Sequence, residues 1–158
     1  TSKQMNTTNT TTGGYQGSAM YKTYIPAINT LLTTDFGTHL CSHRELLSSE
    51  MNTGVRNGPN PGAQGASSNW SWQSVQACLM TEVEVLGATL GTSSGYDIGT
   101  GKTQLPLFKF NTNPFNKDFW TRCVYMFNAF TYINSYGMES WKNASDAIYA
   151  LVRFCIKG

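Results

Sequence analysis

The chain has 158 residues, a formal net charge of +2 at pH 7 and only 13% charged side chains. This length is enough for one domain with a sizeable core. The Lys and Arg residues form no cluster, which argues against a surface that binds nucleic acid through its phosphates. No apolar run reaches the roughly 18 residues that suggest a membrane span, so we expect no membrane insertion. The chain starts at Thr1 rather than Met, and we expect a piece of a longer protein.

Residues 1–14 are rich in Thr, Asn and Gly and show no apolar periodicity. They predict a flexible linker or lead-in, followed by a single ligand-binding domain at 15–158. Apolar residues then recur at helical spacing and predict a helix that Pro26 either starts or kinks. These residues are Met20, Tyr24, Ile28, Leu31 and Leu32.

Residues 38–51 predict a strand or a short helix, and they contain the only two histidines, His39 and His43. A spacing of four positions would suit a pair of metal ligands on a helix. Because no further histidine and no HExxH pattern accompanies them, we interpret both as structural residues.

The middle of the chain alternates loops with short ordered segments. Residues 52–69 and 88–104 are dense in Gly, Pro, Asn, Ser and Thr and predict long loops. Residues 77–80 predict a short buried strand, and Thr81 with Glu84 matches the capping box that begins a helix. The apolar run 105–111 predicts a further strand.

The motif GTGKT at 99–103 resembles the end of a phosphate-binding loop. That loop needs a glycine where Tyr96 stands, so we expect no nucleotide binding. Cys41, Cys78, Cys123 and Cys155 form no CxxC pair, which argues against a zinc site and favours buried, reduced thiols. No Gly-x-Ser-x-Gly motif and no paired carboxylates are present, so we expect no catalytic site, no metal and no cofactor.

The last forty residues predict strands at 119–124, 127–134, 138–141 and 149–156, with a hairpin turn at 135–137. Half of the chain's Phe, Tyr and Trp residues lie here, interleaved with Asn and Ser, a mixture that antibody loops use for recognition. If one domain fills only one core, the large side chains of these strands that do not fit in that core should form a single exposed binding patch. We assign to it Tyr125, Phe127, Asn128, Tyr132, Asn134, Tyr136, Ser140, Trp141, Asn143, Asp146 and Tyr149.

Several segments together resemble the C-terminal ligand-binding domains of bacteriophage tail proteins, which belong to the formylglycine-generating-enzyme-like branch of the C-type lectin fold. The segments include ASSNWSWQSVQACLMTEVEVLG, TSSGYDIG, QLPLFKFN, FWTRCV, AFTYINSYG and NASDAIYALVRF. The most specific parts are Trp120-x-Arg122, Asn134-x-x-Gly137 and Asn143-Ala144-Ser145. The same fold carries the variable proteins of diversity-generating retroelements, in which rewritten Asn-type codons yield residues such as Asn, Tyr, Ser, Asp and Phe. All of the assigned residues except Trp141 fit that palette.

The resemblance implies an α+β domain with a twisted, mostly antiparallel sheet, one or two helices and long loops. It implies that the chain recognises a host cell-surface protein or glycan and is carried on a phage tail or a bacterial surface. A homo-oligomer of the chain is a further expectation. Residues 149–152 depart from the Gly-Val-Arg-Pro that usually stands there in the family. The calcium motifs of sugar-binding C-type lectins are absent, as is the catalytic cysteine pair of the enzymes. The alternatives are a structural assembly module and an enzyme of the same fold with Cys123 or Cys155 as a reactive thiol.

Overall fold

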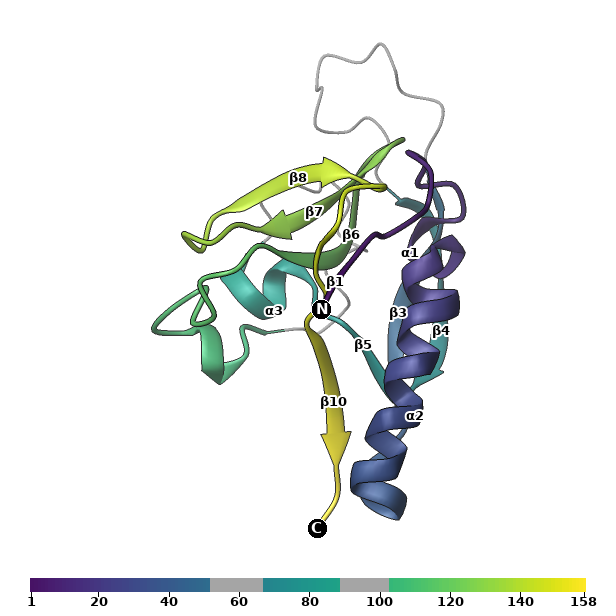
Figure 1. Cartoon of the computed structure of the whole chain (residues 1–158), viewed down its shortest axis with the longest axis vertical. Coiled ribbons are helices and arrows are strands. Elements are labelled where there is room, and N and C mark those ends of the chain that lie inside the picture. The colour runs from purple at the N-terminus through teal and green to yellow at the C-terminus, as the bar shows by residue number, and fades with distance from the viewer. Residues whose placement is uncertain (52–66, 89–102) are drawn as a thin grey trace.

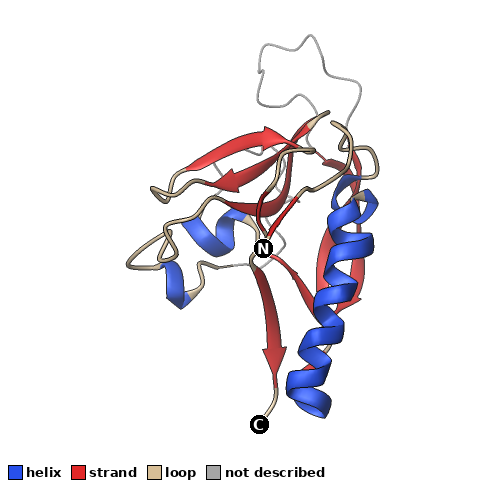
Figure 2. Ribbon diagram, viewed as in Figure 1, coloured by secondary structure: helices blue, strands red, loops and turns tan. Residues whose placement is uncertain are grey.

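The computed structural model describes residues 1–51, 67–88 and 103–158, which form a mixed α+β fold with mostly antiparallel sheets and few helices. Figure 2 shows one long helix that stands beside the strands, with shorter helices on the other side of the molecule. The predicted α+β class is confirmed. The predicted loops at 52–69 and 88–104 and the GTGKT motif lie mostly outside the described residues, although Ser67 already begins a strand.

The long helix begins where the sequence predicted. A short helix α1 (Gly14–Gly17) and a π-helical turn (Met20–Tyr24) lead into α2 (Ile25–Phe36), and Pro26 lies in the first turn of α2. Proline is tolerated there because the first turn of a helix has no partner for its amide groups. The prediction that Pro26 starts the helix proper is confirmed. A 3-10 turn, Gly37–His39, follows α2.

The capping box is also confirmed, at the start of α3 (Glu82–Leu86). Glu84 N donates to the hydroxyl of Thr81 at 3.2 Å, and Thr81 N donates to the Glu84 carboxylate at 2.9 Å. The predicted strand at 105–111 is wrong, because Pro106–Phe108 forms a 3-10 helix instead. Proline supplies no amide donor to a strand ladder, and its fixed φ suits the first turn of a helix.

The strands lie in three sheets within the described residues. The largest has the order β1-β9-β6-β7-β8, and only the β6–β9 pair in it is parallel. Its strands are β1 (Ser2–Lys3), β6 (Phe119–Met126), β7 (Ala129–Ile133), β8 (Glu139–Asn143) and β9 (Ile148–Tyr149). The second sheet, β2-β10-β5, contains Leu40–Cys41, Val152–Ile156 and Ala77–Leu79. The third pairs β3 (His43–Met51) with β4 (Ser67–Val75).

The strand predicted at 149–156 is therefore two strands in two different sheets, β9 and β10 (Figure 1). The turn predicted between the second and third C-terminal strands is confirmed between β7 and β8. Gly137 has φ 81° there, and a Cβ at this position would lie 2.1 Å from the hydroxyl of Thr112. Only glycine satisfies both the left-handed backbone and the close contact.

The N-terminal segment is packed into the domain, so its prediction as a flexible lead-in is wrong. Ser2 and Lys3 pair with β9, Met5 is completely buried, and the hydroxyl of Thr11 donates to Met126 O at 2.8 Å. Asn6 N donates to Ala144 O at 2.8 Å. The polar composition misled the prediction because these groups find hydrogen-bond partners within the chain, and Met5 supplies the buried anchor.

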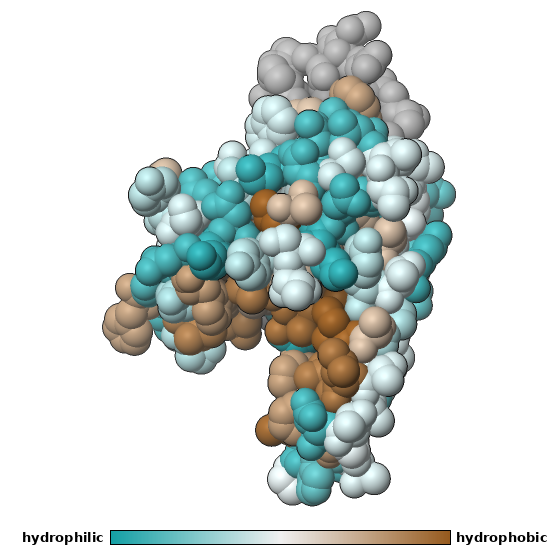
Figure 3. All heavy atoms as spheres, in the orientation of Figure 1, coloured by the Kyte–Doolittle hydropathy of each residue, from teal (hydrophilic) through white to brown (hydrophobic). Residues whose placement is uncertain are grey.

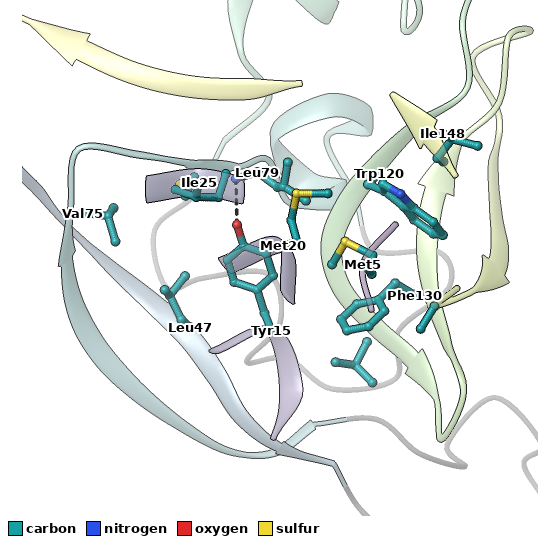
Figure 4. Packing of buried hydrophobic residues seen from close by; sticks show 13 residues of the cluster. Met5, Tyr15, Met20, Ile25, Leu47, Val75, Leu79, Trp120, Phe130 and Ile148 are labelled. Carbon is teal, nitrogen blue, oxygen red and sulfur yellow. Dashed lines mark hydrogen bonds between the residues drawn. The ribbon is translucent and has the colours of Figure 1, made fainter. Parts of the chain in front are cut away.

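The five-stranded sheet has a hydrophobic cluster on each face, which corrects the assumption of a single core. Trp120 and Phe130 point into the main cluster, which Met5, Tyr15, Met20 and Leu79 share (Figure 4). Val124 belongs to the same cluster. Phe119 and Ile133 point to the opposite face and pack with Met80, Val85 and Phe108. Because side chains alternate along a strand, a sheet covered on both faces places large residues on both. The surplus of aromatics in the sequence is therefore partly a second core.

Candidate ligand-binding surface

Two aromatic rings stack above the middle strand of the β6-β7-β8 sheet. Tyr125 of β6 and Trp141 of β8 lie parallel, with ring centroids 5.7 Å apart and an interplanar angle of 5°. Trp141 is the cross-strand partner of Thr131 on β7, and both Thr131 and Ala129 are completely buried. The small side chains of β7 leave room for rings from the two outer strands to meet. Trp141 keeps 47% of its surface exposed.

Two amides lie at the same end of the sheet. Asn128 follows Phe127 in the short connection between β6 and β7, and its Nδ2 donates to Oδ1 of Asn143 at 3.2 Å. The Asn128 carbonyl also accepts from Ala144 N at 2.8 Å. Oδ1 of Asn128 has no hydrogen-bond partner among the described residues. This oxygen is also shielded from solvent, so a ligand donor reaches it only if the Asn128 amide moves.

The N-terminal segment fixes this end of the sheet from behind. Phe127 O accepts from Thr11 N at 3.0 Å, while Asn9 Oδ1 accepts from the backbone and the hydroxyl of Ser145. Phe127 remains 46% exposed, and Asp146 is exposed beside the amides. We call this set the aromatic–amide surface. It comprises Tyr125, Phe127, Asn128, Trp141, Asn143 and Asp146.

The other predicted residues lie elsewhere, so the prediction of one continuous patch is wrong. Tyr132 and Ser140 point to the opposite face of the sheet, where Tyr132 packs edge-on against Trp120. Alternation along β7 and β8 places them there. Lys142 Nζ lies over the Tyr132 ring, 4.8 Å from its centroid.

Asn134 and Tyr136 lie at the far end of the β7–β8 hairpin. The Asn134 side chain accepts from Tyr136 N and Met138 N, both at 3.0 Å, so it builds the turn. Tyr136 is 86% exposed at its tip. Tyr149 lies on β9, which is separated from β7 and β8 by β6.

A second exposed apolar surface was missed by sequence reasoning. Phe110 is almost fully exposed, and Leu107 and Phe115 are also exposed. Their segment packs against the β7–β8 turn, because Asn113 Nδ2 donates to Asn134 O at 2.6 Å. The sequence signal was the apolar run 105–111, which we interpreted as a short strand.

Two concave regions formed by described residues lie away from the predicted ones. Tyr24, Ala27, Ile28 and Leu31 of the helical segment line an apolar groove of about 300 Å³ with Ala150, and Figure 3 shows hydrophobic side chains gathered between α2 and β10. A more polar pocket of about 420 Å³ lies at the start of α2 against the β4–β5 connection.

Sequence reasoning also missed a buried ion-pair network below the sheet. Glu45 of β3 is 1% exposed and accepts from Arg122 Nη2 at 2.8 Å, and Arg153 pairs with the same carboxylate. Arg153 Nε also lies 2.7 Å from Glu84. We call these four residues the buried ion-pair network. The signal in the sequence was the position of Arg122 and Arg153, each of which stands in a mostly apolar run.

Burial shifts the titration of this region. Burial lowers the pKa of Arg153 from its ordinary value. For Arg122 burial acts in the same direction, but the negative charges of Cys78 and Glu84 outweigh it and raise the pKa. Burial also raises the pKa of Tyr15, whose hydroxyl accepts from Leu79 N beside the network. Both guanidinium groups therefore remain charged at neutral pH.

Among the described residues, His43, Glu45 and Cys78 have donor atoms close enough to hold a metal, within 4.8 Å of one another. Arg122 donates to both Glu45 and Cys78, however, and Arg153 contacts Glu45 as well. Two guanidinium groups already supply the positive charge that a cation would bring. The arrangement fits an ion-pair network better than a metal centre. His39 lies apart from it, with Nδ1 3.1 Å from Lys157 O.

Two of the four cysteines are buried as predicted, namely Cys78 and Cys123. For Cys41 and Cys155 the prediction of burial is wrong, because both are partly exposed. None of the described helices is long and apolar enough to cross a membrane. Comparison of the chain with models of protein families, with curated proteins and with solved structures gave no match.

Proposed function

We propose that the chain is a non-catalytic ligand-recognition domain of the C-type lectin type, carried on a phage tail or a similar bacterial surface structure. Its ligand is a protein or a glycan on the surface of a host cell. The resemblance of the C-terminal segments to that family supports the proposal, and the α+β architecture with its antiparallel C-terminal strands is consistent with it.

The observation that carries the proposal is the Tyr125–Trp141 stack beside the Asn128–Asn143 amide pair. Rings that are already held face to face lose little side-chain entropy when a ligand binds. The exposed part of Trp141 offers apolar contact to a sugar ring or an aliphatic side chain, while the amides offer directional hydrogen bonds. Because all four residues belong to a sheet or to its tight connection, the surface is ordered before the ligand arrives.

The test compares two tryptophans with similar exposure. Trp141→Ala removes half of the stack, whereas Trp72→Ala removes a half-exposed tryptophan of β4 that lies against Arg44 in a different sheet. Binding of the labelled full chain is measured by flow cytometry on a panel of bacterial strains and on a panel of immobilised bacterial surface glycans. A hot-spot tryptophan contributes about 2 kcal/mol, so Trp141→Ala should weaken binding about 30-fold and Trp72→Ala should not.

Equal binding by the two folded variants would contradict the proposal, as would a loss caused only by Trp72→Ala. Asn128→Ala provides a second variant, because it removes one amide of the Asn128–Asn143 pair without changing the rings. Its effect should be smaller than that of Trp141→Ala and confined to strains or glycans that the wild type binds.

A structural assembly module is the second candidate, and the exposed apolar residues Leu31, Leu107 and Phe110 favour it. Large apolar patches on a domain surface mark sites of association. Light scattering across a range of concentrations tests this reading, and Phe110→Ser should then shift the chain towards the monomer. An enzyme with a reactive cysteine is the third alternative. A thiol reagent should label Cys123 slowly in the native state, because the residue has no exposed surface.

A further inference from the structure

Two of the cysteines face each other across neighbouring antiparallel strands. Cys155 of β10 is the direct cross-strand partner of Cys41 of β2, and Ile156 pairs with Leu40 beside them. Directly opposed residues of an antiparallel pair point to the same face of a sheet, with Cα atoms about 4.5–5.5 Å apart. A disulfide spans about 4.4–6.8 Å between Cα atoms, so this pair can be bridged with little backbone movement. Both residues are free thiols in this structure.

Exposure separates this pair from the other two cysteines. Cys41 and Cys155 are partly exposed, whereas Cys78 and Cys123 are completely buried. A dissolved oxidant therefore reaches the cross-strand pair and not the buried thiols. Thiol accessibility decides which cysteines exchange disulfides.

A cross-link between these two cysteines would also fix the C-terminal strand β10 in place. β10 is the last strand of the described residues, and its pairing with β5 ends at Phe154, whose ring centroid lies 5.3 Å from that of Phe36 of α2. Beyond Phe154, the strand pairs with β2 through Cys155 and Ile156, and Lys157 N donates to His39 O at 2.9 Å. Figure 1 shows β10 running away from the body of the domain, beside the lower half of α2. A bond between positions 41 and 155 encloses most of the chain, and long enclosed loops restrict the unfolded state most.

We propose that Cys41 and Cys155 form a reversible, redox-responsive disulfide that fastens the C-terminal strand β10 to β2. The oxidant is a small disulfide such as oxidised glutathione. One cysteine thiolate attacks a glutathione sulfur, forms a mixed disulfide and releases one glutathione thiolate, which takes up a proton. The second cysteine thiolate then attacks the protein sulfur of the mixed disulfide and releases the second glutathione. Two electrons pass from the protein thiols to glutathione, and the two thiol protons end on the released glutathione molecules.

The experiment uses the full chain, first reduced and then incubated with oxidised glutathione. The monomer should lose two hydrogens in its intact mass, and digestion without reductant should yield a peptide that links Cys41 to Cys155. Cys78 and Cys123 should remain alkylatable after unfolding. The melting temperature should rise by roughly 5–10 °C relative to the reduced chain and return when dithiothreitol is added.

Cys41→Ser and Cys155→Ser should each abolish both the linked peptide and the rise in melting temperature. Cys123→Ala is the control, because it removes a buried cysteine and should keep the difference between its own oxidised and reduced forms. Mixed glutathione adducts without a cross-link, a link between two chains, or an oxidised form no more stable than the reduced one would each overturn the proposal. The comparison of oxidised with reduced wild type does not depend on any variant folding. The ligand-binding measurements on Trp141 are independent of it.

Discussion

The buried ion-pair network and the aromatic–amide surface use polar groups in opposite ways. In the network, the Glu45 carboxylate receives two guanidinium groups, and Arg153 bridges it to Glu84. On the surface, Asn128 donates to Asn143 without any charged group between them, and Trp141 keeps nearly half of its area in water. The network joins β3, β6, β10 and the start of α3, whereas the surface lies on one end of a single sheet.

The difference teaches how to separate residues that hold this fold from residues available to a ligand. A buried charge whose partners all belong to the chain costs the fold a great deal when one partner is removed. A half-exposed ring or amide contributes little to the fold, because water replaces most of its contacts. Variants in the two regions should therefore differ in unfolding free energy before any ligand is known.

The largest effect is expected at Glu45. Glu45→Gln leaves the buried guanidinium of Arg122 and the partly exposed guanidinium of Arg153 short of a counter-charge, and should lower the free energy of unfolding by about 3–5 kcal/mol. Glu50→Gln is the matched control, since Glu50 lies on the same strand but is exposed. Urea unfolding followed by tryptophan fluorescence measures both. A loss below 1 kcal/mol at Glu45 would show that the network does not hold these strands together.

The next comparison concerns aromatic residues of the same hairpin. Phe130 of β7 is completely buried in the main cluster, and Phe130→Ala should cost about 3–5 kcal/mol. Tyr136 at the tip of the β7–β8 turn is 86% exposed, so Tyr136→Ala should cost less than about 0.5 kcal/mol. Similar losses of unfolding free energy in the two variants would contradict the exposed position of Tyr136 at the turn.

Some features of the fold were predicted from the sequence alone and others were not. Local signals with a specific mechanism were interpreted correctly, such as the Thr81–Glu84 capping box, Pro26 at the start of α2 and the Gly137 turn. Each depends on groups a few positions apart in the sequence. Pro106 carried a similar signal, but the alternating apolar residues around it suggested a strand instead.

Contacts between residues far apart in the chain could not be predicted from the sequence. Nothing in the pattern of Tyr125 to Asn143 reveals that α3 and Phe108 supply a second core under the sheet, so only one core was assumed. Tyr132, which was assigned to the binding patch, packs against the main cluster. Likewise, the packing of residues 1–14 depends on partners more than a hundred positions away, such as Met126 and Ala144. All six residues of the aromatic–amide surface were among the predicted binding residues. Which of the predicted residues lie together depends on strand register, which the sequence does not give.

A smaller loss of stability is expected from the helix cap of α3, which lies next to the buried ion-pair network. Thr81→Ala removes the acceptor for Glu84 N and should lower the free energy of unfolding by about 1–2 kcal/mol, because the cap is buried. Thr30→Ala on the exposed side of α2 is the control and should change it by less than about 0.5 kcal/mol. Chemical denaturation resolves the two. Equal effects would indicate that Glu84 keeps its position through Arg153 alone.

The last prediction concerns Glu139, which lies on the same face of β8 as Trp141 but is half-buried near Glu82 of α3. Burial, followed by the charge of Glu82, raises the pKa of Glu139 from 4.5 to about 7. The folded state therefore binds this proton more tightly than the unfolded state does. The stability that the protonated form contributes is complete below about pH 4.5 and is lost as the pH rises to about 7.

Thermal melts of the wild type at several values between pH 4.5 and 8 should therefore include a decline that Glu139→Gln lacks, because the amide cannot ionise. Glu50→Gln is again the control, and its melting temperature should follow the wild-type slope. The difference between wild type and Glu139→Gln isolates this carboxyl from the histidines, which titrate in both proteins. Parallel curves for wild type and Glu139→Gln would show that Glu139 stays solvated, and that the face bearing Trp141 is open to water down to α3.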